Sequence, residues 1–278
     1  MVPSLLPKFK SPKIKSPKIK PQPAPQPSST VTATVTARSA AKNQQSIRQP
    51  AMTGEGIIQV RNVTKTYRNG SEALVDVNLA IKKGDFLFIT GPSGSGKSTL
   101  LKLLYGEEKP DKGKGEVIVD DAPLHRLKGD RLALLRRRLG IVFQDYKLLP
   151  RRTVQENIAF VLQAQGYTKT EITRRMPSAL KVVGLQHKSN CFPSELSGGE
   201  QQRVSIARAI VGTPPILLAD EPTGNLDPDN SRQILAILRK LNEAGMTIVV
   251  TSHDEAFIRS ANRPIVQIRN GQILPQSN

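Results

Sequence analysis

Short apolar runs alternate with segments of helical spacing from about Ile57 to the end of the chain. Runs rich in Val, Ile, Leu and Phe are the primary signal of buried strands. They predict strands at 57–63, 73–79, 86–90, 140–143, 216–220 and 247–251. Several of these runs are apolar throughout and lie next to helix-like segments, a pattern typical of strands covered on both faces of a sheet. The pattern therefore predicts an α/β fold built on a mainly parallel sheet.

The strand signal disappears between Tyr146 and Pro193. Within this stretch, residues 154–165 and 170–183 have helical spacing instead. We therefore predict a helical subdomain, at about residues 146–210, that is inserted into the sheet domain.

The first 50 residues differ in composition from the rest of the chain. They hold nine of the 21 prolines, none of the 20 glycines, and nine Lys or Arg residues with no Asp or Glu. A near-repeat at 11–15 and 16–20 places a proline at every fifth residue, which excludes a regular helix. We predict a disordered, basic and proline-rich tail over residues 1–50, followed by one globular domain over residues 56–275.

The tail allows two interpretations. Six lysines between Lys8 and Lys20 are interleaved with the apolar side chains of Phe9, Ile14 and Ile19. One interpretation is attraction to anionic lipid, at roughly 1 kcal/mol per lysine near the membrane surface. The other is a solvated segment without a partner, which is common for runs of charge.

Composition narrows the class of protein. The chain has 278 residues and a formal net charge of +18, but half of that excess lies in the tail, so the remainder is only moderately basic. The single cysteine, Cys191, excludes an internal disulfide and a cysteine-rich zinc module, and it fits a reducing cytosolic setting. No stretch approaches about 18 apolar residues, and the N-terminus lacks the apolar region of a signal peptide, so we expect neither a spanning helix nor secretion.

One segment fits the pattern G-x-x-x-x-G-K-[ST] and reads Gly91-Pro92-Ser93-Gly94-Ser95-Gly96-Lys97-Ser98. It follows a predicted strand and opens a predicted helix, as a phosphate-binding loop requires. In such a loop, backbone N–H groups surround phosphate oxygens, Lys97 reaches the β- and γ-phosphates and the Ser98 hydroxyl binds Mg²⁺. Thr99, the next residue, belongs to the same predicted site. The alternative, an ordinary glycine-rich turn, is disfavoured by the order of strand, loop and helix.

Two adjacent carboxylates, Asp220 and Glu221, end the predicted strand at 216–220. In a parallel sheet the carboxyl end of a strand lies at the phosphate-binding crevice. Asp220 suits the Mg²⁺ shell, and Glu221 can polarise the water that attacks the γ-phosphate. Taken alone, the pair is equally compatible with solvated carboxylates after a strand.

A third motif indicates the kind of nucleotide-binding protein, and it reads Leu196-Ser197-Gly198-Gly199-Glu200-Gln201-Gln202-Arg203. It resembles LSGG-x-Q-x-R, the signature of the ATP-binding cassette (ABC) family, and lies where that family places it. In the family two such domains dimerise head to tail. The resemblance implies that Ser197, Gly198 and Gly199 would contact the γ-phosphate held by the other subunit. Glu200 stands where the commonest form has Gln, which leaves the phosphate-facing residues intact.

Further positions match the family one by one. The resemblance implies that Tyr67 stacks on adenine and that Gln144 joins Mg²⁺ and water to the helical subdomain. It also implies that Asp227 belongs to the loop that touches the opposite subunit, and that His253 contacts the γ-phosphate. Taken alone, a tyrosine near a strand is more often a packing residue, and a lone histidine is more often structural.

The resemblance covers about residues 56–275. It implies the P-loop NTPase fold of ABC ATPases, with a mainly parallel sheet core, an antiparallel β region and an inserted helical subdomain. It also implies hydrolysis of ATP with Mg²⁺ in a homodimer, because the chain carries one phosphate loop and one signature. The intact set Lys97, Asp220, Glu221 and His253 disfavours a non-hydrolysing scaffold.

The stretch Arg137–Asn157 resembles the cell-division branch of this family more than its relatives in lipoprotein release and macrolide export, which remain the alternative. That branch implies an integral membrane partner and a peripheral position on the cytoplasmic face of the membrane. An ABC ATPase that acts on nucleic acid is disfavoured, because tryptophan is absent and aromatic content is 4%.

Overall fold

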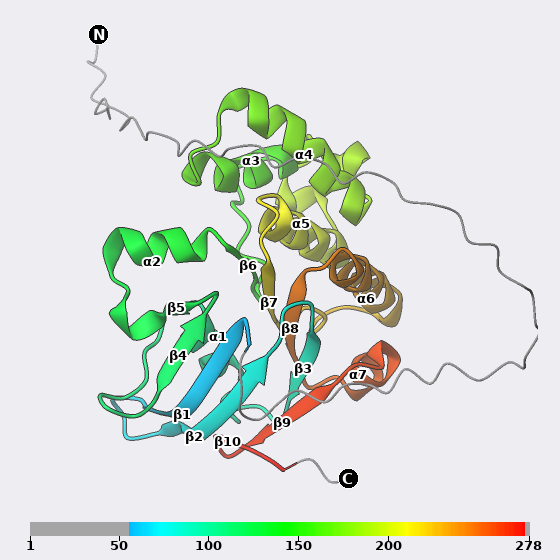
Figure 1. The fold of residues 1–278 in the computed structure, drawn as a ribbon. Helices are drawn as coiled ribbons and strands as arrows, with labels where there is room; N and C mark the ends of the chain where they lie inside the picture. Colours follow the sequence, from blue (N-terminus) through cyan, green and yellow to red (C-terminus); the bar gives the residue numbers. More distant parts are fainter. Residues whose placement is uncertain (1–55, 276–278) are drawn as a thin grey trace, which may run out of the picture. The chain divides into compact units, whose positions relative to one another are not determined.

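A six-stranded sheet forms the centre of the fold in the computed structural model, which describes residues 56–275 (Figure 1). Its strand order is β10-β9-β3-β8-β7-β6, and all neighbours are parallel except β10 and β9. The strands are β3 (Phe86–Thr90), β6 (Leu139–Val142), β7 (Ile216–Asp220), β8 (Thr247–Ser252), β9 (Ile265–Arg269) and β10 (Gln272–Ile273). The predicted parallel sheet is confirmed.

Both faces of this sheet are buried because successive side chains along a strand point to opposite faces. Phe88 and Leu217 belong to one hydrophobic core, whereas Ile89 and Leu218 belong to the other. All four side chains are at most 1% exposed. This two-sided burial is the physical reason that these strands are apolar throughout rather than alternating.

A second, antiparallel sheet covers one face together with α1 (Lys97–Leu104). Its order is β2-β1-β4-β5, formed by β2 (Glu72–Ile81), β1 (Ile58–Thr66), β4 (Glu116–Val119) and β5 (Ala122–Pro123). Apolar side chains of β1 and β2, such as Val60 and Leu79, pack into the same core as α1. The antiparallel region that the family resemblance implies is therefore present.

The opposite face is covered by α5 (Gly198–Ile210), α6 (Pro228–Glu243) and α7 (Glu255–Ala261). Helix α6 is amphipathic, and its buried stripe includes Ile234, Leu238 and Leu241, at the spacing of one helix face. Its first turn is capped by Asp227, whose carboxylate accepts backbone N–H groups from residues 229 and 230.

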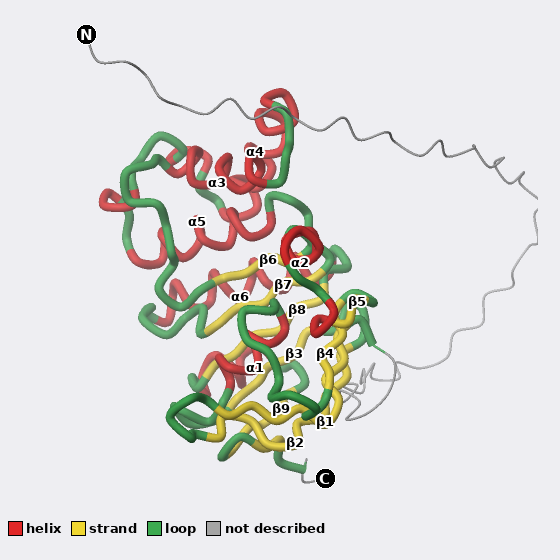
Figure 2. Tube along the Cα trace, turned by 90° about the vertical axis from the view of Figure 1, so that its left-hand side faces the viewer, coloured by secondary structure: helices red, strands yellow, loops and turns green. Residues whose placement is uncertain are grey.

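Helices α3 (Val154–Ala164) and α4 (Lys169–Val183) pack on α5 between β6 and β7 in the chain, and Figure 2 shows these three helices grouped together. Both helices begin with a capping box, formed by Thr153 with Glu156 and by Thr168 with Glu171. The limits 146–210 for a helical subdomain stay a prediction. Within residues 56–275, no helix is long and apolar enough to cross a bilayer.

Helix α2 (Gly129–Arg136) was not among the predicted elements, and neither were the strands β4, β5, β9 and β10. The apolar residues of α2 are consecutive, at 132–135, and so lack the helical spacing on which prediction rests; in the fold only Leu135 is buried. The N-terminal tail, predicted over 1–50, lies outside the described residues.

The entry into α3 is held by one buried amide, that of Asn157, which is 0% exposed. Its Oδ1 accepts the Leu149 N–H at 2.7 Å, and its Nδ2 donates to the carbonyls of Leu149, Arg152 and Thr153 at 3.0–3.1 Å. A buried amide with all of these partners fixes the path of the chain between the sheet and the helical region.

We expect Asn157→Ala to lower the free energy of unfolding by about 3 kcal/mol, because buried backbone groups lose their partners. Gln163→Ala, on an exposed position of the same helix, is the control and should cost less than about 0.5 kcal/mol. Urea denaturation followed by circular dichroism measures both. Equal effects would show that the Asn157 network contributes no stability beyond helix propensity.

Candidate nucleotide-binding site

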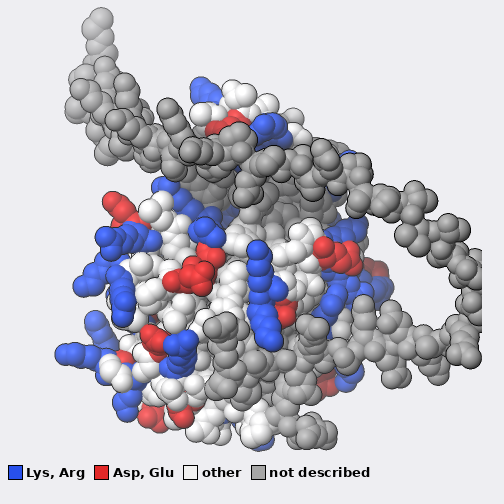
Figure 3. Space-filling view, viewed as in Figure 1, with Lys and Arg blue, Asp and Glu red and all other residues white. Residues whose placement is uncertain are grey.

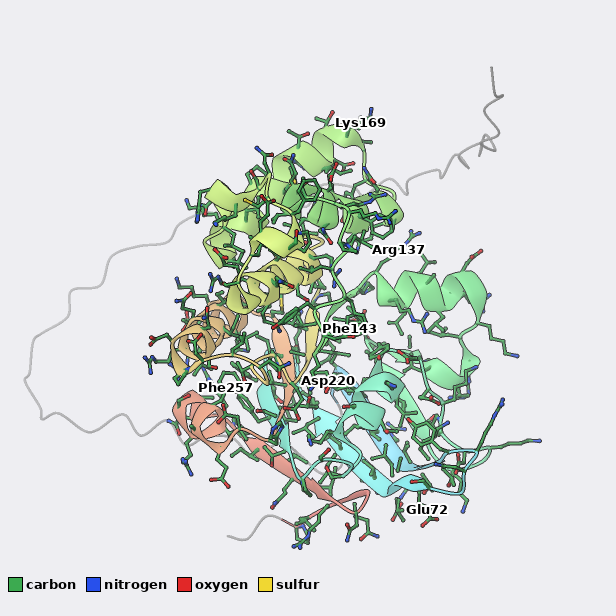
Figure 4. The ribbon with its side chains drawn as sticks, turned by 180° about the vertical axis from the view of Figure 1, so that it is seen from behind. Glu72, Arg137, Phe143, Lys169, Asp220 and Phe257 are labelled. Carbon is green, nitrogen blue, oxygen red and sulfur yellow. The ribbon has the colours of Figure 1, made fainter. Side chains whose placement is uncertain are left out.

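Three chain segments meet at the carboxyl ends of β3, β7 and β8, which are neighbours in the sheet. The phosphate loop follows β3, the paired carboxylates end β7, and His253 follows β8. Asp220 lies at this edge, close to Phe143 at the end of the adjacent β6, in the middle of the view in Figure 4. The topology therefore brings together candidate residues that are more than 150 positions apart in sequence.

The loop Gly91–Ser98 turns directly into α1, whose N-cap is Gly96. Gly96 has φ 108°, and a Cβ there would collide with the carbonyl oxygen of Ala73. Only glycine fits this position. Helix α1 has no side-chain cap and no acidic residue in its first turn, so its N-terminal N–H groups are left for an anion. The loop thus fits a phosphate group.

The ammonium group of Lys97 lies at the centre of the loop and is 6% exposed. It donates to the carbonyls of Gly91 at 2.9 Å and Pro92 at 3.0 Å, and its Nζ lies 3.7 Å from Glu221 Oε1. Because carbonyl oxygens are neutral acceptors, phosphate oxygens can replace them as stronger partners.

Glu221 is 8% exposed and lies between two nitrogen groups. Its Oε2 lies 2.7 Å from His253 Nδ1, and its Oε1 faces Lys97. The backbone of Glu221 has φ 47°, a left-handed conformation that is uncommon for a residue with a side chain. Its N–H donates to both the carbonyl and the hydroxyl of Thr251, which hold this conformation.

Asp220 Oδ1 accepts two hydroxyl groups, from Ser98 at 3.1 Å and from Thr251 at 2.6 Å. The hydroxyl of Ser98 and the carboxylate of Asp220 are the hard oxygen donors that Mg²⁺ prefers, and they already lie in contact. Among residues 56–275, no cluster of three or more His, Cys, Asp or Glu side chains could hold a metal ion. This sparse set fits Mg²⁺, which takes its remaining ligands from phosphates and water.

Tyr67, the candidate adenine platform, follows β1 and contacts α1. Its hydroxyl lies 3.2 Å from Thr99 Oγ1, and the ammonium of Lys65 lies 5.4 Å from its ring centroid. The ring lines a hollow together with Lys65, Arg68 and Asn69. The contact with Thr99 brings the predicted base-binding residue to the helix that carries the phosphate loop.

Gln144 is exposed and follows β6. Its Nε2 lies beside Gly224, in the turn where the Gly224 N–H donates to the carbonyl of Glu221 at 3.1 Å. Asp227 ends this turn. Its carboxylate accepts hydrogen bonds from the backbone N–H of Asn230, which has the larger effect, and from the Asn230 side chain. Both hold the pKa of the Asp227 carboxyl below its usual range. Asp227 is therefore ionised at neutral pH.

The signature motif forms the start of α5. Ser197 is the exposed N-cap, and its hydroxyl accepts the Glu200 N–H at 3.3 Å while Glu200 Oε2 accepts the Ser197 N–H at 2.8 Å. That second bond is the main reason that the pKa of Glu200 is lowered. Glu200, the departure from the commonest signature, therefore completes a capping box and leaves Ser197 and Gly198 at the surface.

Sequence reasoning missed residues that join the motifs. Thr251 links Asp220 and Glu221, and it lies opposite Asp220 in the register of β7 and β8. Asn230 links the turn ending at Asp227 to the signature helix, because Arg203 Nη1 donates to Asn230 Oδ1 at 3.0 Å and a Cβ on Gly199 would collide with that oxygen. Strand order and helix packing were needed to find these partners, and no local motif signals them.

Comparisons with known proteins agree with this geometry. Residues 74–224 match the ABC transporter family. The chain is 48% identical to the cell division ATP-binding protein FtsE of Streptococcus pneumoniae serotype 2 (strain D39 / NCTC 7466). The match extends over 218 residues and covers 78% of this chain and 94% of that protein. It is 43% identical to FtsE of Bacillus subtilis (strain 168), over 78% of this chain and 95% of that protein.

Solved structures lead to the same family. A dimeric structure of MJ0796, a bacterial ABC transporter cassette, is 41% identical with a TM-score of 0.72, and the match covers 80% of this chain and 98% of that one. A second dimeric structure of MJ0796, in a post-hydrolysis state bound to ADP and phosphate, gives 40% identity and the same TM-score. The chain therefore belongs to the ABC transporter family of ATP-binding cassettes and, within it, to the FtsE group.

Proposed function

We propose that this chain is the ATP-hydrolysing subunit of an FtsEX-like membrane complex, which regulates cell-wall hydrolysis in bacterial cell division. The observation that carries the proposal is the buried Glu221 carboxylate, which is held between Lys97 and His253 beside an uncapped helix N-terminus. The identity of 43–48% to FtsE proteins over nearly their whole length supports the biological role.

The arrangement suits phosphoryl transfer to water. The phosphate loop and Lys97 would neutralise and orient the phosphates of ATP, while Tyr67 would support the base. Glu221 is the candidate general base, and His253 fixes its carboxylate through the 2.7 Å contact. Gln144, beside Gly224, would help to position the attacking water.

Ser98 and Asp220 would hold Mg²⁺, with Gln144 as a further candidate ligand. Mg²⁺ held there would neutralise negative charge on the phosphates of ATP.

A homodimer would complete each site. Ser197, Gly198 and Asp227 are exposed in the single chain, so a second copy can reach them. The dimeric structures of the related MJ0796 cassette support a homodimer, for which we propose head-to-tail pairing. In that arrangement Ser197, Gly198 and Gly199 of one subunit contact the γ-phosphate that the other subunit binds, which makes hydrolysis conditional on dimerisation.

The membrane partner would be an integral protein resembling FtsX, which places this chain as a peripheral protein on the cytoplasmic face. The distribution of charge disfavours nucleic acid as an alternative partner. On the face drawn in Figure 3, basic and acidic side chains of the described residues are interspersed rather than separated into a basic stripe.

The Glu221→Gln variant tests the catalytic role. We expect it to bind ATP and to favour the ATP-bound dimer, while kcat for hydrolysis falls by about 100-fold to 10,000-fold because the general base is lost. Steady-state phosphate release and size-exclusion chromatography with Mg-ATP measure these effects. Glu243→Gln, an exposed carboxylate at the end of α6, is the control and should keep the wild-type rate. A Glu221→Gln rate within a few-fold of wild type would refute the assignment.

Capture of the partner tests the biological role. Tagged Glu221→Gln protein, incubated with Mg-ATP and detergent-solubilised membranes of its host, should retain an FtsX-like protein that mass spectrometry identifies. The same capture without nucleotide is the control, since a closed dimer is the expected docking form. Recovery of a lipoprotein-release or macrolide-export permease in place of FtsX would contradict the cell-division assignment.

For residues 1–50 we propose contact with anionic lipid, on the charge of their six clustered lysines. Deletion of these residues should leave the ATPase rate within about two-fold of wild type, and it should weaken co-sedimentation with phosphatidylglycerol liposomes at low salt. The difference should disappear near 0.5 M salt because ions screen the attraction.

A variant with the six lysines between Lys8 and Lys20 changed to glutamine is the matched control for chain length, and it should behave like the deletion. Unchanged liposome binding in both variants would remove the lipid hypothesis.

A further inference from the structure

The side chain of Arg208, near the end of helix α5, contacts the segment that follows Gln144. The guanidinium of Arg208 donates from Nη2 to the carbonyl of Tyr146 at 2.7 Å and from Nη1 to the carbonyl of Lys147 at 2.5 Å. These two carbonyls begin two residues after Gln144, the candidate water-positioning residue. Arg208 therefore binds the backbone of the loop that carries Gln144. This contact does not depend on which side chains stand at positions 146 and 147.

The backbone at this point is in an uncommon conformation. Tyr146 and Lys147 have φ of 58° and 51°, so two consecutive residues with side chains occupy the left-handed region. Such residues persist only where the surroundings hold them. Arg208 is half-buried, and burial lowers the pKa of its guanidinium from the usual value. A half-buried cation that donates to the carbonyls of these two residues holds the loop against α5.

The other end of α5 carries the residues that would face a second subunit in the proposed homodimer. Ser197 caps the helix. A Cβ on Gly198 would lie 3.3 Å from the Tyr146 hydroxyl, so the loop that Arg208 binds also reaches the signature motif. Between these ends Arg203 binds Asn230, next to Asp227. One rigid helix thus connects the loop after Gln144 to Ser197.

We infer that Arg208 is a positioning residue, which locks the Gln144 loop to the signature helix so that a movement of Gln144 towards bound nucleotide displaces Ser197 with it. This inference rests on the proposed ATPase function. It assigns no contact between Arg208 and substrate. Its consequence is that ATP-driven dimerisation depends on Arg208, whereas ATP binding by the single domain does not.

The test uses Arg208→Ala and Arg208→Lys in the full-length chain, each also combined with Glu221→Gln. Lysine keeps the positive charge but is shorter and lacks the planar fork that matches two carbonyls. The matched control is Arg239→Ala, because half-buried Arg239 also donates to two consecutive carbonyls, those of Ser260 and Ala261, in the contact of α6 with α7.

Three measurements separate positioning from general stability. Hydrogen exchange without nucleotide should be at least five-fold faster for peptides covering residues 144–149 in both Arg208 variants. The Kd for Mg-ATP at protein concentrations below dimerisation should stay within about three-fold of wild type. In the Glu221→Gln background, the ATP concentration that gives half-maximal dimer should rise by ten-fold or more, while Arg239→Ala changes none of these values.

Dimerisation of both Arg208 variants at the same ATP concentration as the Glu221→Gln parent would overturn the inference, even if their melting temperatures fall. If Arg208→Ala does not fold, Arg208→Lys decides the question. A parent protein that binds no ATP would instead overturn the proposed function, and the exchange of residues 144–149 would then still show whether Arg208 holds the loop.

Discussion

The buried carboxylate of Glu221 is the constraint around which the rest of the site is arranged. A carboxylate that is 8% exposed needs partners, and it has Lys97 from the phosphate loop and His253 from the end of β8. Those partners come from different strands, so the sheet must place β3 and β8 side by side with β7 next to β8. The stable parallel core therefore holds the buried carboxylate of Glu221 in a fixed position beside the phosphate loop.

Thr251 shows how closely the sheet and the site are linked. Its hydroxyl donates to Asp220 and accepts the N–H of Glu221, while its carbonyl accepts the same N–H. The two neighbouring carboxylates are turned in different directions by this one residue, one towards Ser98 and the other towards Lys97. One carboxylate is therefore suited to a metal ligand and the other to a base, although they are adjacent in sequence.

The helical region has its own centre in α5, which begins with the signature motif and carries Arg208 in its last turn. Arg203, Arg208 and Gly199 connect it to the turn that ends at Asp227 and to the loop after Gln144. Because a helix bends little over three to four turns, contacts along it stay in fixed relation to one another. In the proposed mechanism the cassette responds to nucleotide in one place and presents Ser197 in another, and such a rigid connection would link the two.

The sequence by itself determined four strands of the parallel sheet (β3, β6, β7 and β8), the phosphate loop, the paired carboxylates and the family, because each depends on residues close together in the chain. Apolar runs mark two-sided burial, and glycine, lysine and serine at fixed spacing mark a phosphate site. It did not reveal α2, which buries only Leu135 and so lacks an apolar face. Only the tertiary structure decided that Thr251 joins Asp220 to Glu221, that Asn230 meets Gly199, and that Arg208 holds the backbone after Gln144. The reason is physical: strand order and helix packing set these contacts between residues 30 to 62 positions apart, and no local pattern in the chain encodes a partner at that separation.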